Sequence, residues 1–297
     1  MMKTISKGDR IGYLFILPAL VFMSALMFYP IIYNFVISMQ KVDVMTLLNP
    51  HKQFIWFDNY INIFKSKVLI NAIVKSFTFT IGCIIFQFSF GFLLAVLFNR
   101  ENKVFKFMRA VMLVPYILPA TVSAIVFKFI FSVNGGIANE FLQTIGLIDK
   151  PVEWLLHPET AMLSVIIANI WCGVPFNMIL LSAGLANIPK DLYESAEIDG
   201  ANAFQKFFAI TVPSLKSSIE AVLVLGFVYT FRVFEIVYVM TNGGPVNGTE
   251  IMAILSYKTS FINFNFAEGA AISNILFLIL FIVGIFYSKM IKKDEVM

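Results

Sequence analysis

Six long apolar stretches divide the chain, and each is long enough to form a membrane-spanning helix. A helix needs about 20 mostly apolar residues to cross the hydrocarbon core of a bilayer. The stretches of this length are 11–39, 69–98, 105–131, 160–186, 217–240 and 268–290. The first carries Pro18 and Pro30 and has no small-residue cleavage site after it, so we expect a retained helix rather than a signal peptide. The pattern predicts an all-α polytopic membrane protein with 1–297 as a single transmembrane domain.

The composition agrees with a protein that lies in lipid. Hydrophobic residues make up 59% of the chain and charged residues only 13%, whereas soluble domains carry about 25% charged residues. The two cysteines, Cys83 and Cys172, both fall inside apolar stretches. They have neither the spacing of a disulfide framework nor that of a metal site, and we interpret them as packing residues.

The basic residues are distributed unequally between the segments that join the apolar stretches. With both termini in the cytoplasm, thirteen of the 22 Lys and Arg residues lie on the cytoplasmic side and six on the outer side. An excess of positive charge marks the cytoplasmic loops of membrane proteins. We therefore interpret the net charge of +4 as an orientation signal in a plasma or inner membrane rather than as a sign of nucleic-acid binding.

The connecting segments differ in length. Residues 187–216 form a long amphipathic segment on the predicted cytoplasmic side, whereas 99–104 allow only a tight turn. A long cytoplasmic segment with a helical pattern needs a protein to bind against. The outer segments 40–68, 132–159 and 241–267 are also long, and we expect them to meet an extracytoplasmic partner.

The segment 187–216 has the pattern of two short helices. Pro189 suits a first helical position, and Gly200 stands where a left-handed helix stop is needed. The second helix would carry apolar residues at helical spacing, and Pro213 would break the chain before the next span. These apolar residues are Phe204, Phe207, Phe208 and Ile210.

The same segment resembles the EAA signature of binding-protein-dependent ABC importer permeases. That signature is E-A-A, three residues, G, nine residues and I-x-L-P, and the chain has Glu194-Ser195-Ala196, Gly200 and Ile210-Thr211-Val212-Pro213 at that spacing. Ser195 and Val212 depart mildly from it. The resemblance implies a coupling helix that binds a separate ATPase. The residues that it assigns to this contact are Glu194, Ala196, Glu197, Asp199, Gly200, Ala201, Phe207, Ile210 and Pro213.

Other segments extend the resemblance over most of the chain. Residues 114–119, 169–176 and 241–245 look like the family's proline-rich third span, its fourth span and its T-G-G-G-P segment, with Asn242 in place of one glycine. The last is typical of the first of two paired permeases in carbohydrate importers of the maltose and glycerol-phosphate type. The resemblance implies the six-helix type I importer fold, a second permease, two ATP-binding subunits that hold ATP and Mg, and an external binding protein.

Sequence signatures of an enzyme are absent. The chain has no G-x-x-x-x-G-K-[ST] phosphate loop, nucleophile elbow or zinc motif. His51 and His157 fall in predicted outer segments without a catalytic set around them. We expect a subunit that is not an enzyme and binds no cofactor or metal itself.

Polar residues inside the spans are the candidates for a transport pathway, because such residues are costly in lipid and usually face a cavity or a partner. Arg232 and Glu235 stand three residues apart, so we expect them to share a helix face. They could line the pathway as a gate, or pair as a structural couple. The pathway candidates in full are Trp171, Asn177, Tyr229, Arg232, Glu235 and Asn274. Packing remains the alternative for each aromatic among them.

Two functions from other classes stay open at this point. An ion-gradient-driven secondary transporter of a small polar solute would show inverted repeats and intramembrane carboxylates. A membrane-anchored scaffold would need neither. The favoured hypothesis is the permease of an ABC importer for a carbohydrate, and the sequence leaves the identity of that carbohydrate open.

Overall fold

The structure is a computed structural model whose regular elements are helices. It describes the chain over residues 7–49, 51–99 and 102–294, and the side chains of 15–49, 51–99 and 102–289. The two termini, which the charge distribution predicts to be cytoplasmic, lie outside these ranges.

The described residues form two compact units. The first is built from Met1–Lys67 and Ser256–Ile275, and the second from Val68–Leu255 and Leu276–Met297. The expectation of one domain over 1–297 remains a prediction.

In the first unit, one helical run is followed by a short helix. The run continues without a gap through α1 (Lys7–Met23), a π-helical turn η1 (Ser24–Phe28) and α2 (Tyr29–Ser38). The short helix α3 (Asp58–Lys65) follows it. The second stretch of this unit contains the π-helical turn η3 (Lys258–Ile262).

A buried polar cluster holds distant parts of the first unit together. The side chain of Asn274 accepts a hydrogen bond from Asn34 Nδ2 at 2.6 Å and donates to Ser38 Oγ and Tyr60 OH, both at 3.0 Å. Asn59 donates from the same region to the carbonyls of Ser38 and Gln40. Buried polar groups are stable only when they are hydrogen-bonded, so this network determines how these segments pack.

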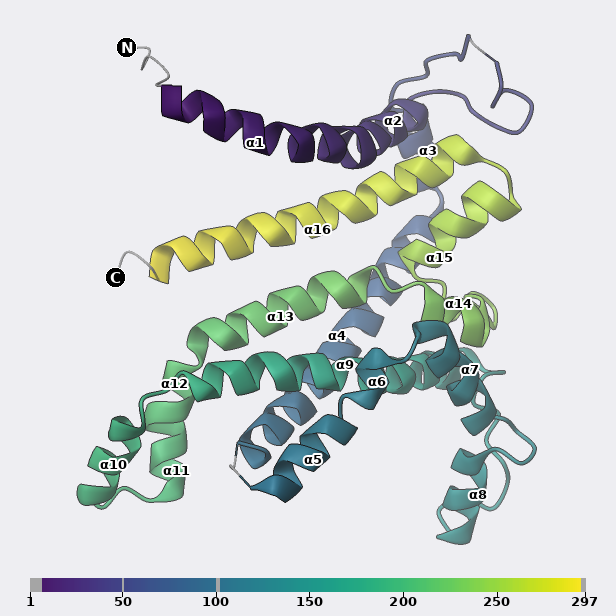
Figure 1. Cartoon of the computed structure of the whole chain (residues 1–297). Coiled ribbons are helices and arrows are strands. Elements are labelled where there is room, and N and C mark those ends of the chain that lie inside the picture. The colour runs from purple at the N-terminus through teal and green to yellow at the C-terminus, as the bar shows by residue number, and fades with distance from the viewer. Residues whose placement is uncertain (1–6, 50, 100–101, 295–297) are drawn as a thin grey trace. The chain divides into compact units, whose positions relative to one another are not determined.

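The helices of the second unit are joined mostly by short connections (Figure 1). They are α4 (Lys67–Leu97), α5 (Lys103–Val111), α6 (Val114–Ile117), α7 (Ala120–Ile130), α8 (Ile137–Thr144), α9 (Pro158–Ala186), α10 (Lys190–Ile198), α11 (Ala203–Lys206), η2 (Phe207–Thr211), α12 (Val212–Ser214), α13 (Lys216–Phe231) and α14 (Glu235–Thr241). Two further helices contribute residues to both units: α15 (Met252–Tyr257) and α16 (Phe266–Asp294).

The described helices agree with a count of six spans. Four stretches are long and apolar enough to cross a membrane: Phe15–Ser38, Lys67–Leu97, Pro158–Ala186 and Phe266–Lys289. Two bent pairs add one span each when each pair is counted as one, namely Lys103–Ile117 with Ala120–Ile130 and Ala203–Ser214 with Lys216–Phe231.

The third span differs from the single helix expected over 105–131, because it bends by 96° between α6 and α7. Pro119 explains the bend. A residue before proline is pushed out of the helical region, and Leu118 is extended with φ −68° and ψ 138°. The α7 helix then begins at Ala120.

The fifth span also differs from the single helix expected over 217–240. Helix α13 ends at Phe231, and α14 starts only at Glu235. The intervening residues, Arg232 to Phe234, leave the helical ladder although none of them is Gly or Pro. After the break, α14 packs against α7 and α9.

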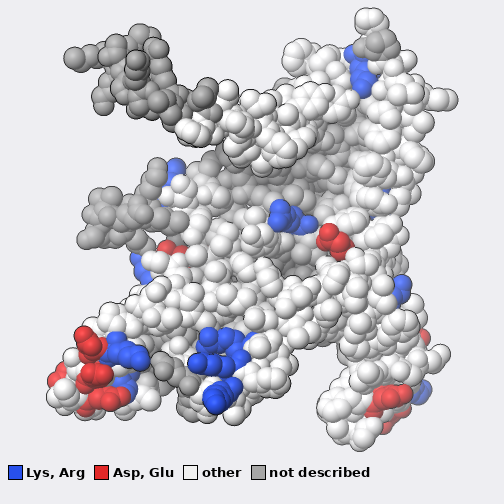
Figure 2. Space-filling view, in the orientation of Figure 1, with Lys and Arg blue, Asp and Glu red and all other residues white. Residues whose placement is uncertain are grey.

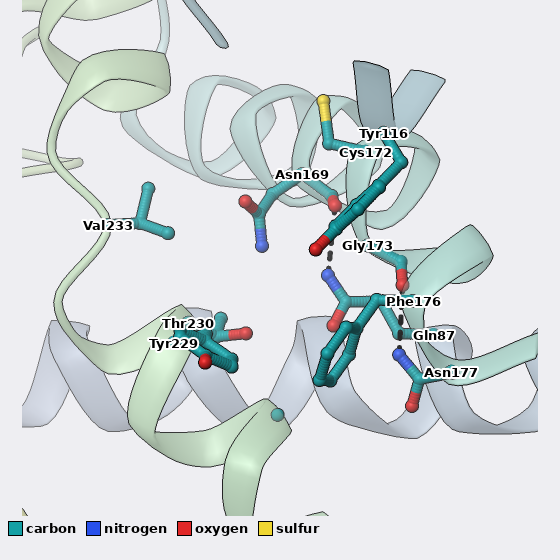
Figure 3. A pocket seen from close by; sticks show the side chains of 11 residues that line it. Gln87, Tyr116, Asn169, Cys172, Gly173, Phe176, Asn177, Tyr229, Thr230 and Val233 are labelled. Atoms are coloured by element: carbon teal, nitrogen blue, oxygen red, sulfur yellow. Dashed lines mark hydrogen bonds between the residues drawn. The ribbon is translucent and has the colours of Figure 1, made fainter. Parts of the chain in front are cut away.

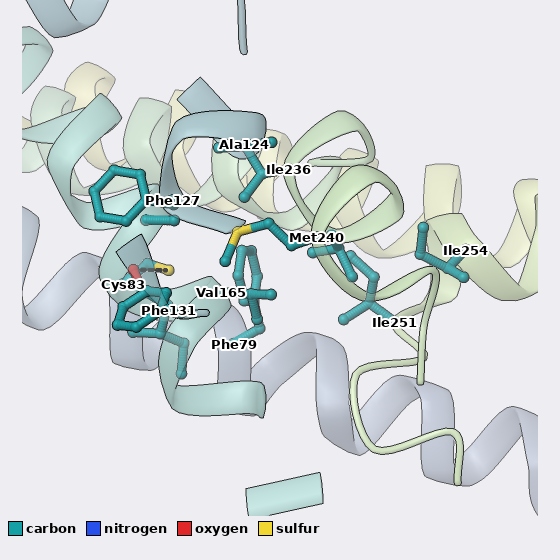
Figure 4. Close-up of a cluster of buried hydrophobic side chains, with 13 residues drawn as sticks. Phe79, Cys83, Ala124, Phe127, Phe131, Val165, Ile236, Met240, Ile251 and Ile254 are labelled. Carbon is teal, nitrogen blue, oxygen red and sulfur yellow. Dashed lines mark hydrogen bonds between the residues drawn. The ribbon is translucent and has the colours of Figure 1, made fainter. Parts of the chain in front are cut away.

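A buried apolar cluster lies where α4, α7, α9 and α14 meet (Figure 4). Its large members include Phe79 of α4, Phe127 of α7, Val165 of α9 and Met240 of α14, and Ile251 closes it from the segment after α14. A second cluster, around Met178, lies between the other halves of α4, α9 and α13. Between them the two clusters fix how α4 and α9 pack along their length.

Helices α4 and α9 pack tightly against each other at two glycines. A Cβ on Gly91 of α4 would lie 2.5 Å from Cβ of Asn177 and 3.1 Å from the backbone nitrogen of Met178. On α9, a Cβ on Gly173 would meet the side chain of Gln87. Small residues at such positions let helix backbones pack closely in lipid.

We expect Gly91→Ala to destabilise the second unit by about 1–3 kcal/mol, as overpacking of a tight contact does. Gly284→Ala is the matched control, because a Cβ there has no atom within 4 Å and Ala is favoured over Gly inside a helix. The midpoint of heat-induced loss of the folded protein in detergent measures both. A midpoint for Gly91→Ala equal to or above that of Gly284→Ala would contradict the close helix contact.

Candidate functional site

The segment between α9 and α13 folds as a bent pair of helices, in agreement with its sequence pattern. Gly200 follows α10 with φ +77°, a conformation that is routine only for glycine. The amide of Ala201 donates to the carbonyl of Ala196 at 2.8 Å, and the amide of Gly200 donates to that of Glu197 at 3.1 Å. This pair of hydrogen bonds is the Schellman motif, which satisfies the last carbonyls of a helix.

The second helix of the pair starts immediately after this turn. Asn202 accepts a hydrogen bond from the amide of Gln205, whose side chain accepts from the amide of Asn202, which makes a capping box. The helical stretch then runs through η2 and α12 to Ser214. A bend of 64° precedes α13, two residues after Pro213. We call residues Lys190 to Ser214, the helical part of the segment 187–216, the coupling loop, after the role that the resemblance implies.

One face of the coupling loop packs onto the ends of α4 and α9. The hydroxyl groups of Tyr193 and Thr211 lie 2.9 Å apart and join α10 to η2. The ring of Phe207 packs edge-on against Phe92 of α4, with centroids 5.7 Å apart. Ile210 packs against the second apolar cluster. These contacts hold the loop on the second unit.

The other face is exposed and combines apolar with charged side chains. Ile198 is 88% exposed and Phe204 is 72% exposed, and Glu194 and Asp199 are also exposed. Figure 2 shows charged side chains of both signs gathered over the end of the second unit that carries α10 and α11. An exposed apolar residue with charged neighbours is typical of a surface that binds a protein partner.

An ion pair connects the two helices of the loop across its exposed side. Lys206 Nζ lies 2.6 Å from Glu197 Oε1. The hydrogen bond from Lys206, with the charge of its ammonium group, lowers the pKa of the Glu197 carboxyl below its ordinary value of 4.5. This pair therefore forms at neutral pH.

The residues that the resemblance assigned to the ATPase contact differ in where the structure places them. Glu194, Asp199 and Pro213 are exposed. Ala196, Gly200 and Ala201 form the turn, and Glu197 is paired within the loop. Phe207 and Ile210 pack inward, so they anchor the loop. Sequence reasoning missed Ile198 as a surface residue and treated Phe204 only as a member of the helical stripe.

A hollow of about 250 Å³ opens inside the second unit, between α4, α6, α9 and α13 (Figure 3). Its lining mixes amides and hydroxyls with aromatic rings: Gln87, Tyr116, Asn169, Cys172, Gly173, Phe176, Asn177, Gly226, Tyr229, Thr230 and Val233. The lining contains no Asp, Glu, Lys, Arg or His, so the hollow suits a neutral polar ligand.

Hydrogen bonds and ring contacts hold parts of this lining in place. Gln87 Nε2 donates to the carbonyl of Asn169, and Asn177 Nδ2 donates to that of Gly173, both at 2.9 Å. The ring of Phe176 packs edge-on against Tyr229 with centroids 5.4 Å apart. The lining thus combines fixed amides with aromatic faces.

Two of the predicted pathway residues, Asn177 and Tyr229, line this hollow. Trp171 packs instead against Phe127, with ring centroids 5.6 Å apart, and is not part of the lining. Asn274 belongs to the polar cluster of the first unit. The lining residues Gln87, Tyr116 and Asn169 were missed, although a glutamine and an asparagine inside apolar spans are a signal that the sequence already contains.

Arg232 and Glu235 were expected to share a helix face. In the structure the helix is broken between them, so they do not share one. Both residues are described and exposed, and no ion pair joins them. The guanidinium of Arg232 lies 5.1 Å from the centre of the Tyr229 ring instead. Such a cation–π contact places Arg232 beside the hollow.

The segment after α14 forms a closed turn. Asn242 adopts a left-handed conformation with φ +50°, which Asn tolerates better than most residues. The hydroxyls of Thr241 and Thr249 lie 2.6 Å apart, and Thr249 donates to the carbonyl of Gly244 at 2.7 Å. Asn therefore serves where the family pattern has glycine.

Several apolar spans, a polar hollow between them and an exposed coupling loop define a multi-pass membrane transport protein. Residues 87–292 match the family of binding-protein-dependent transport system inner membrane components. The chain belongs to this family, and it is a membrane permease of the ABC importer type.

Relatives and solved structures agree with this assignment. The chain is 32% identical to the trehalose/maltose transport system permease protein MalF of Thermococcus litoralis, over 94% of this chain and 93% of the relative. It is 28% identical to the diacetylchitobiose uptake system permease protein DasB of Streptomyces coelicolor, over 97% and 88%. A chain in the crystal structure of a bacterial alginate ABC transporter has the same fold, with a TM-score of 0.82, 24% identity and coverage of 97% and 96%.

We expect Glu197→Gln to loosen the coupling loop at neutral pH, because it removes the ion pair with Lys206. A carboxyl whose folded-state pKa is lowered stabilises the fold above its ordinary pKa and loses that contribution as the pH falls through the lowered value. Hydrogen-exchange protection of α11 should therefore be higher in the wild type at pH 7 and converge with the variant well below pH 4.5. Glu194→Gln, on the same helix, should leave it unchanged. Equal protection in wild type and Glu197→Gln at pH 7 would contradict the ion pair.

Proposed function

We propose that this chain is the first of two paired permeases in an ATP-driven carbohydrate importer and that it forms half of the translocation pathway. The exposed face of the coupling loop carries the proposal, because it presents Ile198 and Phe204 among charged residues while Phe207 and Ile210 anchor it from below. ATP and Mg would be held by two separate ATP-binding subunits. This chain would contribute no catalytic residue.

The coupling loop can transmit movement because it is attached at both of its helices. A partner that pushes on Ile198 or Phe204 would move α10 and α11 together, because the ion pair of Glu197 with Lys206 joins these two helices. The contact of Tyr193 with Thr211 and that of Phe207 with Phe92 carry the displacement to α4 and α13. Opening and closing of the pathway would follow from this displacement.

The names of relatives and the chemistry of the hollow support a carbohydrate cargo. The relatives carry trehalose and maltose or diacetylchitobiose in their names, and one solved structure of the alginate importer contains a periplasmic protein bound to an alginate pentasaccharide. Amides and aromatic faces such as Asn169 and Tyr229 suit a neutral sugar, whose hydroxyls form hydrogen bonds and whose C–H faces pack on rings.

The proposed orientation places both termini and the coupling loop in the cytoplasm of a bacterial cell. The outer segments 132–159 and 241–267 then face an extracytoplasmic binding protein. Asn139 supports the first of these segments as a fixed surface, because its buried amide bonds the carbonyl and amide of Val152 and accepts from Trp154 Nε1. Family membership argues against the gradient-driven carrier.

Ile198→Ser and Phe204→Ser test the central part of the proposal. Each removes an exposed apolar side chain, so co-purification of the ATPase with this chain should fall by about tenfold or more, as at a binding hot spot. Ile198→Ser is the cleaner variant, because Phe204→Ser also removes the contact between the Phe204 and Phe208 rings, whose centroids lie 4.6 Å apart. Phe141→Ser, at a phenylalanine of α8 that is similarly exposed, is the matched control and should retain the ATPase. Wild-type association in both loop variants would overturn the proposed ATPase contact.

A variant of the hollow in the same experiment separates the ATPase contact from sugar transport. Tyr229→Ala should keep the ATPase bound but lower sugar uptake and sugar-stimulated ATP hydrolysis, because it removes one aromatic face of the hollow. Uptake that equals the wild type in Tyr229→Ala would remove the hollow from the pathway while leaving the coupling loop in place.

A further inference from the structure

A second hollow, of about 370 Å³, lies beside the coupling loop. It is enclosed by the chain just after α4, by α5, by the end of α9 and by the start of α10. Its lining residues are Asn99, Lys106, Arg109, Leu185, Ala186, Ile188, Lys190 and Tyr193. We call it the basic hollow.

Positive charge distinguishes the basic hollow from the neutral one in the core of the unit. Lys106 and Arg109 reach it from α5, and Lys190 from the first turn of α10. Among the described lining residues there is no carboxylate. Lys106 and Arg109 on one concave surface attract an anion, and the low-dielectric walls strengthen that attraction.

Arg109 is prepared to bind an oxygen acceptor. One of its terminal nitrogens donates to the carbonyl of Phe98, which fixes the guanidinium. Its Nε is buried and has no acceptor among the described residues. A buried donor without an acceptor is costly, and a guanidinium offers donors in the fork geometry that matches phosphate oxygens.

The other residues of α5 indicate the depth in the membrane at which the basic hollow lies. Val104, Phe107, Met108 and Val111 are exposed apolar residues of the same helix, and Figure 2 shows basic side chains gathered over α5. A short helix with an exposed apolar side and a basic side is typical of the interface between lipid tails and headgroups. Basic residues at that level bind anionic headgroups.

We propose that the basic hollow binds a phosphate group, supplied by the headgroup of an anionic phospholipid of the cytoplasmic leaflet. The phosphate would accept hydrogen bonds from Lys106 and Arg109, while the acyl chains extend along the apolar side of α5. The assignment to this leaflet depends on the orientation proposed above.

The location links the bound phosphate to the coupling loop. Tyr193 lines the basic hollow, and its hydroxyl lies 2.9 Å from that of Thr211. Lys190 begins α10, the helix that ends just before the turn at Gly200. A phosphate in the hollow therefore stabilises the anchored position of the loop, and the lipid composition becomes a regulator of coupling.

The test is made on the importer purified through a tag on this chain, delipidated and then given phosphatidylglycerol or phosphatidylcholine. Native mass spectrometry measures the lipid retained. We expect selective retention of phosphatidylglycerol, reduced about fivefold in Lys106→Gln and in Arg109→Gln, as one basic contact at a membrane surface contributes. Lys103→Gln is the matched control, because Lys103 lies one turn earlier on α5 and does not line the hollow. Lys106→Gln stays informative if Arg109→Gln loses the fold together with its bond to Phe98.

The outcomes separate the sources of the phosphate and the possible partners. Displacement of phosphatidylglycerol by millimolar inorganic phosphate would uphold the phosphate site but assign it to a soluble anion. Equal loss of lipid in Lys103→Gln, or no loss in any variant, would overturn the proposal. Loss of the ATPase with lipid retained would assign the hollow to a protein group instead. If the Lys106 and Arg109 variants lose lipid but still co-purify the ATPase, the lipid site is distinct from the proposed ATPase contact.

Discussion

The left-handed backbone of one residue, Gly200, determines how the coupling loop is built. With φ +77° it ends α10 and lets the amides of Gly200 and Ala201 satisfy the last carbonyls of that helix. The chain can then reverse into α11, close enough for Lys206 to reach Glu197 at 2.6 Å. The exposed positions of Ile198 and Phe204 follow from this reversal. The packing of Phe207 against Phe92 holds the coupling loop on α4.

Local rules predicted the features that depend on backbone chemistry. Gly200 was expected to be left-handed, and it is. Pro213 was expected to stop the second helix, and the bend comes two residues later. The bend of the third span has a local cause of the same kind, because Leu118 before Pro119 is extended. Glycine permits backbone angles that other residues avoid, and proline restricts its own angles and those of the residue before it, so a single sequence is enough to reveal these effects.

Features that depend on tertiary contacts could not be predicted in the same way. The break after Phe231 has no Gly or Pro, so helical spacing suggested a pairing of Arg232 with Glu235 that the structure does not contain. The apolar stripe of the coupling loop could not be divided into anchoring and exposed residues without knowing that Phe92 lies opposite Phe207. The polar cluster around Asn274 could not be predicted, because its partners Asn34 and Tyr60 are more than 200 positions away in the chain.

The measurement that tests the role of Gly200 most directly compares Gly200→Asn with Gly200→Val in sugar uptake and ATPase co-purification. A Cβ at this position meets no atom within 4 Å, so within this chain both substitutions change the backbone preference rather than the space. Asn tolerates the left-handed conformation, whereas a β-branched residue there is a genuine outlier. We expect Gly200→Asn to retain most activity and Gly200→Val to lose most of it. Equal activity in the two variants, whether high or low, would contradict the requirement for a left-handed residue.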